Sequence, residues 1–175
     1  SPDFGVWVRL DAYELHTEGG ITLEEAKKIA QVADEEGMHA IAVSAYATIT
    51  TGSAFTDAPL VQKPAGFLDW AAQINAVVNA PVIALVRSEP EVGDKAIAAG
   101  DGDCIAMGRK LLADPELPNK LIAGKPETIR PCIYCYVCVS QIFMNQRIKC
   151  AANPFTGQES QKLIMPATTT QHVVI

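Results

Sequence analysis

Short apolar runs alternate along the chain with amphipathic stretches of helical length. Four of the runs have the length of β-strands and cover residues 6–10, 40–44, 81–86 and 103–107. They are apolar almost throughout rather than at alternate positions, which is typical of strands covered on both faces. The stretch after each run carries apolar residues at helical spacing. The pattern predicts an α/β fold in which four strands form a parallel sheet with right-handed crossovers.

The predicted helices have recognisable ends. Thr22 with Glu25, and Ser88 with Glu91, have the spacing of capping boxes, and we expect each pair to mark a helix start. Helices are accordingly predicted at 22–37, 67–78 and 88–100, followed by two short ones that open at Gly108 and at Asp114. Four such units are either half of an eight-stranded barrel or a small open doubly wound sheet.

Composition narrows the function classes. The chain has 175 residues with 49% apolar and 19% charged residues, which is typical of a globular domain with a sizeable core. The net charge of −6 argues against binding to nucleic acid or to an anionic membrane surface. No apolar run is long enough to span a bilayer, and no secretory signal is recognisable. We therefore expect a cytoplasmic protein.

Four of the five cysteines lie close together. Cys132, Cys135 and Cys138 recur at every third position, and Cys150 stands apart. Thiolates repel one another and resist burial, so such a group is stable only when it is oxidised or bound to metal. Zinc sites usually take two separated Cys-x-x-Cys pairs, whereas this spacing favours an iron–sulfur cluster. A zinc knuckle or a pair of disulfides is the alternative.

Three basic positions follow or interrupt the predicted strands. Arg87 and the pair Gly108-Arg109 come after the third and fourth strands, where parallel sheets commonly bind phosphate. Solvent-facing ion pairs are the alternative for both arginines. Arg9 lies inside the first strand, where its guanidinium would either stabilise negative charge on a bound ring system or form a structural salt bridge.

Other chemistry-bearing residues give weaker signals. His16 and Tyr46 follow the first two strands and are candidates for substrate contact. We expect His39 and His172 to be structural or solvated, and Cys104 to be a small core residue within the fourth strand.

Several motifs together resemble one known family. They are Gly-Arg-Lys-Leu-Leu-Ala-Asp-Pro at 108–115, Pro-Asn-Lys at 118–120, Arg-Pro-Cys-Ile-Tyr-Cys at 130–135 and Cys-Ala-Ala-Asn-Pro at 150–154. The sequence resembles the iron–sulfur branch of the old yellow enzyme family, the NADH:flavin oxidoreductases related to 2,4-dienoyl-CoA reductase and trimethylamine dehydrogenase. The likeness extends from about Val6 to Glu159.

The resemblance implies a domain plan and a set of cofactors. Residues 1–126 would be the last four units of an FMN-binding TIM barrel, 127–159 a 4Fe-4S segment, and 160–175 a linker with the start of a nucleotide-binding domain. The first half of the barrel and the domains that bind FAD and NAD(P)H would lie outside this chain. The resemblance implies that Arg9 contacts the flavin ring. It also implies that the FMN phosphate is bound by Arg87, Gly108 and Arg109. The cluster ligands implied by the resemblance are Cys132, Cys135, Cys138 and Cys150.

Three departures from the family leave the substrate open. Val86 stands where the family often has glycine, and residues 46–66 contain no histidine. The Cys135-x-x-Cys138 spacing is closer to the amine dehydrogenases than to dienoyl-CoA reductase. We expect an enoyl or dienoyl thioester, an enone or an amine as substrate, and catalytic groups mostly from the absent half. The alternative from another class is a non-catalytic half-barrel with a zinc knuckle that serves as a folding or interaction module.

Overall fold

The computed structural model describes residues 4–47, 63–85, 87–161 and 168–169. Within it the chain divides into two compact units, residues 1–108 and residues 109–175, and each is described by itself. Several sequence predictions fall on residues outside the described ranges. They concern Val86, the side chain of Tyr46 with most of the segment 46–66, most of the predicted linker, and His172 with the strand start at 172–175.

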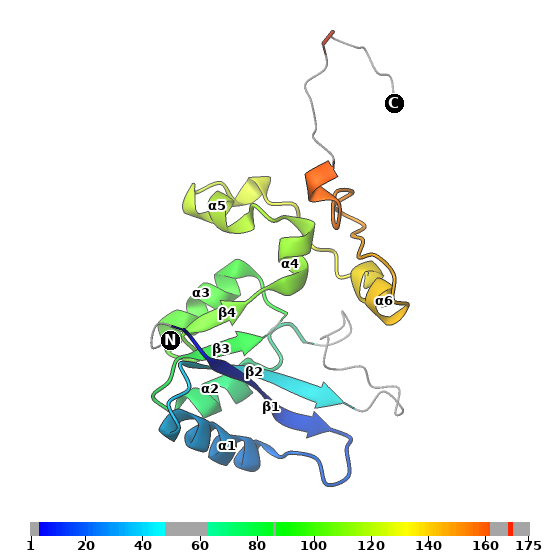
Figure 1. Cartoon of the computed structure of the whole chain (residues 1–175). Helices are drawn as coiled ribbons and strands as arrows, with labels where there is room; N and C mark the ends of the chain where they lie inside the picture. Colours follow the sequence, from blue (N-terminus) through cyan, green and yellow to red (C-terminus); the bar gives the residue numbers. More distant parts are fainter. Residues whose placement is uncertain (1–3, 48–62, 86, 162–167, 170–175) are drawn as a thin grey trace. The chain divides into compact units, whose positions relative to one another are not determined.

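Unit 1 is built on a four-stranded parallel sheet. Its strands are β1 (Trp7–Leu15), β2 (Ala40–Ala47), β3 (Val82–Leu85) and β4 (Cys104–Ala106), and they lie side by side in chain order (Figure 1). A doubly wound sheet reverses its strand order near the middle, and this sheet does not. The α/β prediction with a parallel sheet is confirmed, and the strand order is that of consecutive units of a barrel.

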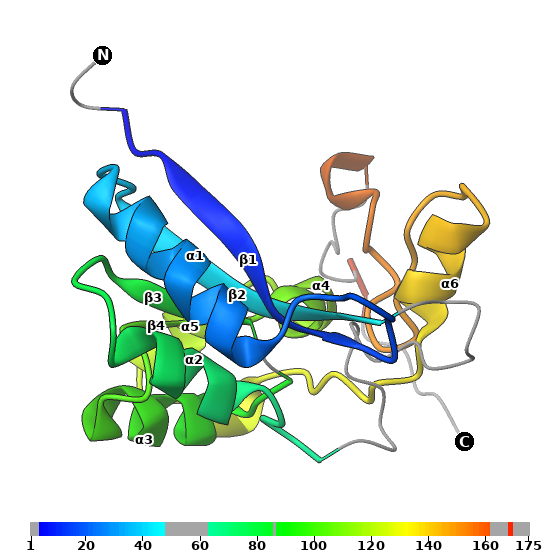
Figure 2. The same ribbon diagram turned by 90° about the horizontal axis from the view of Figure 1, so that it is seen from below.

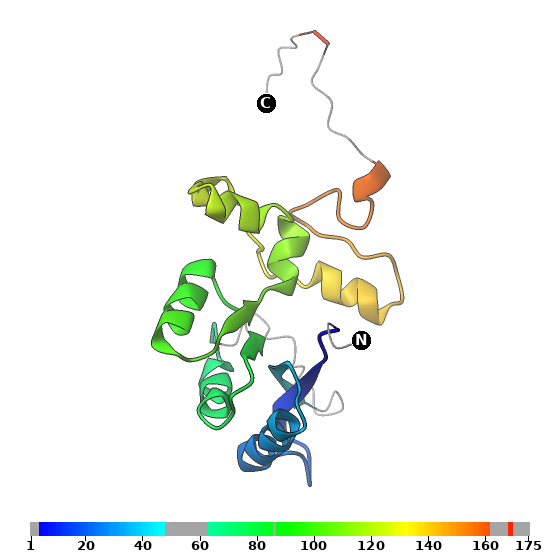
Figure 3. The same ribbon diagram turned by 60° about the vertical axis from the view of Figure 1, so that its left-hand side comes forward.

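Three helices cover one face of this sheet. They are α1 (Leu23–Glu35), α2 (Leu68–Asn75) and α3 (Pro90–Ala99), and Figures 2 and 3 show them along the same side. Right-handed crossovers that step in one direction always place their helices on one face. The core lies between the two layers and is formed by small and branched apolar residues, namely Leu10, Ala12, Ala26, Ala30, Ile41, Val43, Ala71, Ile74, Ala80, Val82 and Ala84.

Among the described residues of unit 1, no helix lies against the opposite face of β1. Leu10 and Ala12 point into the core, while Trp7 keeps 63% of its surface exposed and Arg9 is also exposed. Our expectation that every strand is covered on both faces is therefore wrong for β1 in this unit, because side chains alternate along a strand and helices cover one side only. Cys104, expected in the core, is exposed at the first position of β4.

The helix ends confirm one capping box and correct the other. At α1 the Thr22 hydroxyl accepts from the Glu25 amide at 3.4 Å, and the Glu25 carboxylate accepts from the Thr22 amide at 2.9 Å. At α3 the N-cap is Glu89, and the Ser88 hydroxyl instead donates to the Glu89 carbonyl oxygen at 2.9 Å. Proline at the next position already fixes the backbone for the first turn, so the helix begins there without a side-chain cap.

β1 is also longer than predicted. It continues to Leu15, although the sequence reads as a polar loop from Asp11 onward. Past an irregularity after Asp11, Glu14 and Leu15 pair with Tyr46 and Ala47 of β2. Pairing with a neighbouring strand satisfies the backbone hydrogen bonds, and that gain outweighs the low strand propensity of the acidic residues.

Beyond β4 the chain forms short helices joined by extended segments. These are α4 (Gly108–Ala113), α5 (Leu117–Ile122) and α6 (Val137–Phe143), with the single 3-10 turns η3 (Pro126–Thr128) and η4 (Glu159–Gln161). The predicted helix start at Gly108 is confirmed, whereas the next helix begins after Glu116 rather than at Asp114. None of the described helices is long and apolar enough to cross a membrane.

Candidate functional site

Arg9 takes part in a hydrogen-bonded relay on the helix-free face of the sheet. Its Nε donates to the Ser44 hydroxyl at 3.0 Å, and that hydroxyl donates to the Asp11 carboxylate at 2.5 Å. Asp11 and Ser44 are direct partners in the β1–β2 register, and Arg9 lies two residues earlier on the same face of β1. Among the described residues, no direct ion pair of Arg9 supports the alternative of a structural salt bridge, and its contact with a bound ring system stays a prediction. The guanidinium is exposed and oriented through a serine.

Arg87 lies at the carboxyl end of β3, as the sequence predicts. It is 8% exposed, and its carbonyl oxygen accepts from the Ala65 amide at 2.8 Å, which holds its backbone against the chain that precedes α2. A buried arginine at a strand end does not fit the alternative of a solvent-facing ion pair. Its assignment to phosphate is not tested by these contacts and stays a prediction.

Gly108 and Arg109 open α4, as predicted. A Cβ added at Gly108 would meet no atom within 4 Å, so the space beside its backbone is open. The Arg109 guanidinium carbon lies 5.4 Å from the ring centre of Tyr134 and 5.2 Å from that of Tyr136. Lys110 also contacts the ring of Tyr134, and the distance from its ammonium nitrogen to the ring centroid is 5.4 Å. Two cations therefore lie against the aromatic residues that alternate with the cysteines.

The loop that carries three of the cysteines has an unusual backbone. Tyr134 and Tyr136 adopt φ angles of 52° and 63°, in the left-handed region that side chains other than glycine rarely occupy. These two residues flank Cys135, so the chain turns tightly on both sides of it. The segment then enters α6 with Cys138 in its first turn.

All five cysteines are free thiols. Burial raises the pKa of Cys138, with a smaller upward contribution from Cys132, while the Val139 amide and Arg109 act in the opposite direction. Cys132 and Cys138 are thus electrostatic neighbours. Within the described ranges, no three His, Cys, Asp or Glu side chains form a group that could hold a metal ion. The four-cysteine ligand set predicted from the sequence stays a prediction.

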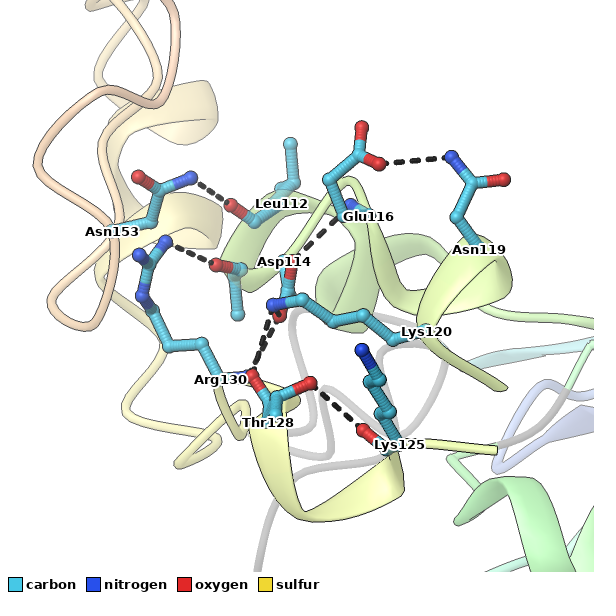
Figure 4. Close-up of polar contacts among 10 residues, drawn as sticks. Leu112, Asp114, Glu116, Asn119, Lys120, Lys125, Thr128, Arg130 and Asn153 are labelled. Atoms are coloured by element: carbon cyan, nitrogen blue, oxygen red, sulfur yellow. Dashed lines mark hydrogen bonds and ion pairs between the residues drawn. The ribbon is translucent and has the colours of Figure 1, made fainter. Parts of the chain in front are cut away.

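Asp114 organises the polar interior of unit 2 (Figure 4). One of its carboxylate oxygens accepts from the Lys120 ammonium at 2.6 Å and from the Arg130 amide at 2.7 Å, and the other accepts from the Glu116 amide at 3.1 Å. Lys120 also donates to the Thr128 carbonyl oxygen at 2.9 Å. The carboxylate is 3% exposed, so these contacts are made away from bulk water, where each is stronger.

The final carbonyl groups of α4 receive donors from both ends of the cysteine segment. The Asn153 amide and the Thr156 hydroxyl donate to the Leu112 carbonyl oxygen at 2.9 and 3.0 Å, and the Arg130 guanidinium donates to that of Ala113 at 3.1 Å. Carbonyls at a helix end have no partner within the helix and need one from elsewhere. Arg130 precedes Cys132 and Asn153 follows Cys150, so one helix end fixes both ends of the cysteine segment.

Burial and hydrogen bonding compete at Asp114. Burial alone would raise the pKa of this carboxyl, but the hydrogen bonds from Lys120 and from the Arg130 amide outweigh it and hold the pKa below its ordinary value of 3.8. The group is therefore ionised at neutral pH and acts as an acceptor only. An ionised carboxylate with these partners fixes the turn that leads from α4 into α5.

Sequence reasoning missed the partners of the predicted site residues. The sequence pattern places Ser44 at the end of the second strand and assigns it no role, although the alternation of Arg9 and Asp11 on one face of β1 indicates that a polar neighbour on β2 is needed. Asp114 and Asn153 each precede a proline, a sequence typical of turns that hold side-chain hydrogen bonds. His39 is predicted to be structural or solvated, and its Nδ1 accepts from the Val6 amide at 2.9 Å.

Comparisons with known proteins agree on the family. The model of the NADH:flavin oxidoreductase / NADH oxidase family matches residues 1–128. An NADH oxidase of Thermoanaerobacter brockii is 40% identical over 165 residues, which is 90% of this chain and 24% of that protein. A cinnamate reductase of Clostridium sporogenes is 36% identical over 119 residues, which is 67% of this chain and 18% of that protein.

A solved structure leads to the same conclusion. The complex of 2-naphthoyl-CoA reductase with 2-naphthoyl-CoA has a TM-score of 0.83 and 30% identity, over 92% of this chain and 25% of that one. The chain thus spans about a quarter or less of the length of the proteins it matches. The resemblance recognised in the sequence is confirmed, and the chain belongs to the NADH:flavin oxidoreductase / NADH oxidase family of flavin-dependent oxidoreductases.

Proposed function

We propose that this chain is the second half of an FMN-binding barrel together with the 4Fe-4S segment of a larger oxidoreductase. The observation that carries the proposal is the double attachment of the cysteine segment to the end of α4, through Arg130 and Asn153. The segment between these two attachments carries four of the cysteines, and four thiols are the donor set that an iron–sulfur cluster would require. The remaining barrel units and the domains for FAD and NAD(P)H would complete the protein.

FMN would supply hydride chemistry at its ring, and the residues of this chain would bind and orient it. Arg9 is the proposed contact of the flavin ring, since an exposed guanidinium on an uncovered sheet face is available to a ligand. Arg87, Gly108 and Arg109 are the proposed phosphate contacts, by resemblance to the family. The open space beside Gly108 fits a close approach of its backbone to a phosphate.

The cluster would carry single electrons, and the protein would set its potential through nearby charge and burial. Burial raises the pKa of Cys138, and the charge of Arg109 opposes part of that rise, while Lys110 lies against Tyr134. Cations in this position favour thiolate ligands and the more negative, reduced state of a cluster. The cysteine segment therefore has both the donors and the positive surroundings that such a cofactor needs.

The substrate is proposed as a small organic molecule, either one with an activated double bond or an amine. Cinnamate reductase and 2-naphthoyl-CoA reductase are named for an unsaturated acid and an aromatic thioester. An enoyl or dienoyl thioester is the favoured class, with enones and amines as the others. Electrons would pass between NAD(P)H, the cluster, FMN and this substrate. A cytoplasmic location remains part of the proposal.

Cofactor analysis of anaerobically purified protein tests the proposal. We expect stoichiometric FMN, with about four iron atoms and four acid-labile sulfides for each chain. The competing function, a half-barrel module with a structural zinc knuckle, predicts stoichiometric zinc and no sulfide. A Cys135→Ser variant should lose iron and sulfide, while the matched variant Cys104→Ser should retain both. Zinc without sulfide in the wild-type protein would refute the cluster assignment.

The phosphate contacts can be ranked by FMN titration of the complete protein. Arg109→Ala should weaken FMN binding more than Arg87→Ala, because the residue before Arg87 is valine where the family often has glycine, and a side chain at that position would narrow the approach of a phosphate to the backbone. Loss of a charge-assisted hydrogen bond to phosphate should reduce affinity roughly ten- to a hundred-fold. Equal FMN affinity in the Arg109 variant and the wild-type protein would contradict its assignment.

A further inference from the structure

The relay from Arg9 to Asp11 has a fixed direction. The Ser44 hydroxyl has one hydrogen, and it points to the Asp11 carboxylate, so the same oxygen is left to accept from Arg9 Nε. A cation, a hydroxyl and an anion are thereby connected in sequence. Ser44 is 3% exposed, so water has little access to the central group. The two hydrogen bonds restrict the torsion angles of the Arg9 side chain.

The backbone fixes the geometry of this relay. Asp11 and Ser44 are register partners on neighbouring parallel strands, and Arg9 projects from the same face of β1 two residues earlier. Both strands also bury their alternate residues, Leu10 and Val43, in the core. The positions of the three polar groups are therefore set by the hydrophobic packing on the opposite face of the sheet. This rigidity is what a group that must meet a ligand precisely in space requires.

We propose that Ser44 and Asp11 are positioning residues that hold the Arg9 guanidinium for the flavin and moderate its charge. The inference rests on the proposed function, in which Arg9 contacts the flavin ring. Ser44 fixes the Nε edge of the guanidinium and leaves its other nitrogens to face a ligand. Asp11 places a negative charge behind Ser44, which opposes the stabilisation that Arg9 gives to an anionic reduced ring.

Opposite charges on the two ends of the relay predict opposite effects on the flavin potential. Arg9→Ala removes the cation that favours the anionic reduced flavin, so the flavin becomes harder to reduce. Asp11→Asn removes the opposing anion, so the flavin becomes easier to reduce. Ser44→Ala releases the guanidinium from its fixed position and should move the potential part of the way toward that of Arg9→Ala. Ser44→Thr keeps the hydroxyl and should retain the wild-type value.

The test is a dye-equilibrated redox titration of bound FMN in the complete protein, with FMN content measured for each variant. At a fixed ambient potential, Arg9→Ala should lower the ratio of reduced to oxidised flavin about tenfold, and Ser44→Ala should lower it less. The double variant with Arg9→Ala and Ser44→Ala should have the same flavin potential as Arg9→Ala alone. Asp103→Asn is the matched control, since Asp103 precedes β4, the third strand from β1 in the sheet order, and its carboxylate accepts from the Val82 amide at 2.8 Å.

The outcomes separate the relay from the function on which it rests. An unchanged potential in Arg9→Ala would overturn the assignment of Arg9 to the flavin, and the relay with it. A shift in Arg9→Ala with unchanged potentials in Ser44→Ala and Asp11→Asn would overturn the relay alone. The relay would also be overturned if Ser44→Ala shifted the flavin potential by the same amount in the presence and absence of Arg9. A Ser44→Thr variant whose flavin potential differs from the wild-type value would overturn it as well.

Discussion

The two units of this chain are stabilised in different ways. In unit 1 the buried set is mainly apolar and lies between a sheet and three helices, with residues such as Ile41 and Ile74 fully enclosed. In unit 2 the buried residues include Lys110, Asp114 and Asn153, and the apolar ones are few. Unit 1 is therefore stabilised by a conventional hydrophobic core, whereas unit 2 is stabilised mainly by hydrogen bonds from side chains to the backbone.

This difference explains why the two units tolerate change differently. Apolar burial is non-directional, so a core accepts substitutions that preserve volume and pattern. A buried carboxylate with three donors depends on each partner, because an unsatisfied charge in the interior is costly. The residues around the cysteines are therefore more restricted than those of the sheet, although the sheet is the larger structure.

The largest expected effect is in the core of unit 1. Ile41 is fully buried on β2, and Ile41→Ala should destabilise unit 1 by about 2–5 kcal/mol through lost burial and the cavity left behind. Peptide-resolved hydrogen exchange should show faster exchange across β1, β2 and β3, with little change after residue 109. Ile97→Ala on α3 is the control, since that residue is 45% exposed and its truncation should cost much less. Equal destabilisation of both units would contradict their separation.

In unit 2 the largest expected effect is at Asp114. Asp114→Asn removes the charge that Lys120 and the Arg130 amide share, and should cost about 2–3 kcal/mol. Exchange should accelerate in the segments around residues 112–120 and 128–132, while the sheet of unit 1 stays protected. Glu127→Gln replaces an exposed acid of the same unit and should have no measurable effect. Faster hydrogen exchange in the sheet of unit 1 in the Asp114→Asn variant would show that the stabilities of the two units are not independent.

The two units should also differ in their stability at low pH. The pKa of Asp114 is lowered in the folded protein, so the stabilisation that its ionised form provides is complete above about pH 4 and is lost as the pH falls through the lower folded value. Unit 2 should therefore lose exchange protection on acidification before the core strands of unit 1 do. Asp114→Asn should abolish this part of the pH dependence. Parallel loss of protection in both units would contradict the prediction.

The smallest effect concerns the cap of α1. Thr22→Ala removes the hydroxyl that accepts from the Glu25 amide and should cost about 1 kcal/mol, confined to the first turn of α1. Thr22→Ser keeps the hydroxyl and should retain wild-type stability. Circular dichroism during denaturant unfolding measures the difference. A loss much larger than about 2 kcal/mol would mean that this helix end also supports the sheet.

Local sequence signals predicted the sheet because they rest on short-range chemistry. The apolar runs located all four strands, and Thr22 and Gly100 marked helix ends that the structure confirms. Strand length was less predictable. β1 reaches Leu15 because β2 offers it backbone partners, and no property of Asp11 or Glu14 alone indicates that.

The sequence by itself determined the family, the order of strands and helices, and the identity of the four clustered thiols. These depend on residue types and spacings that are read locally. Only the tertiary structure decided that Arg9 is oriented by Ser44, and that Arg130 and Asn153 meet at the end of α4. Those partners are far apart in the chain. Hydrogen bonds join groups that are close in space, and the folded backbone decides which groups those are.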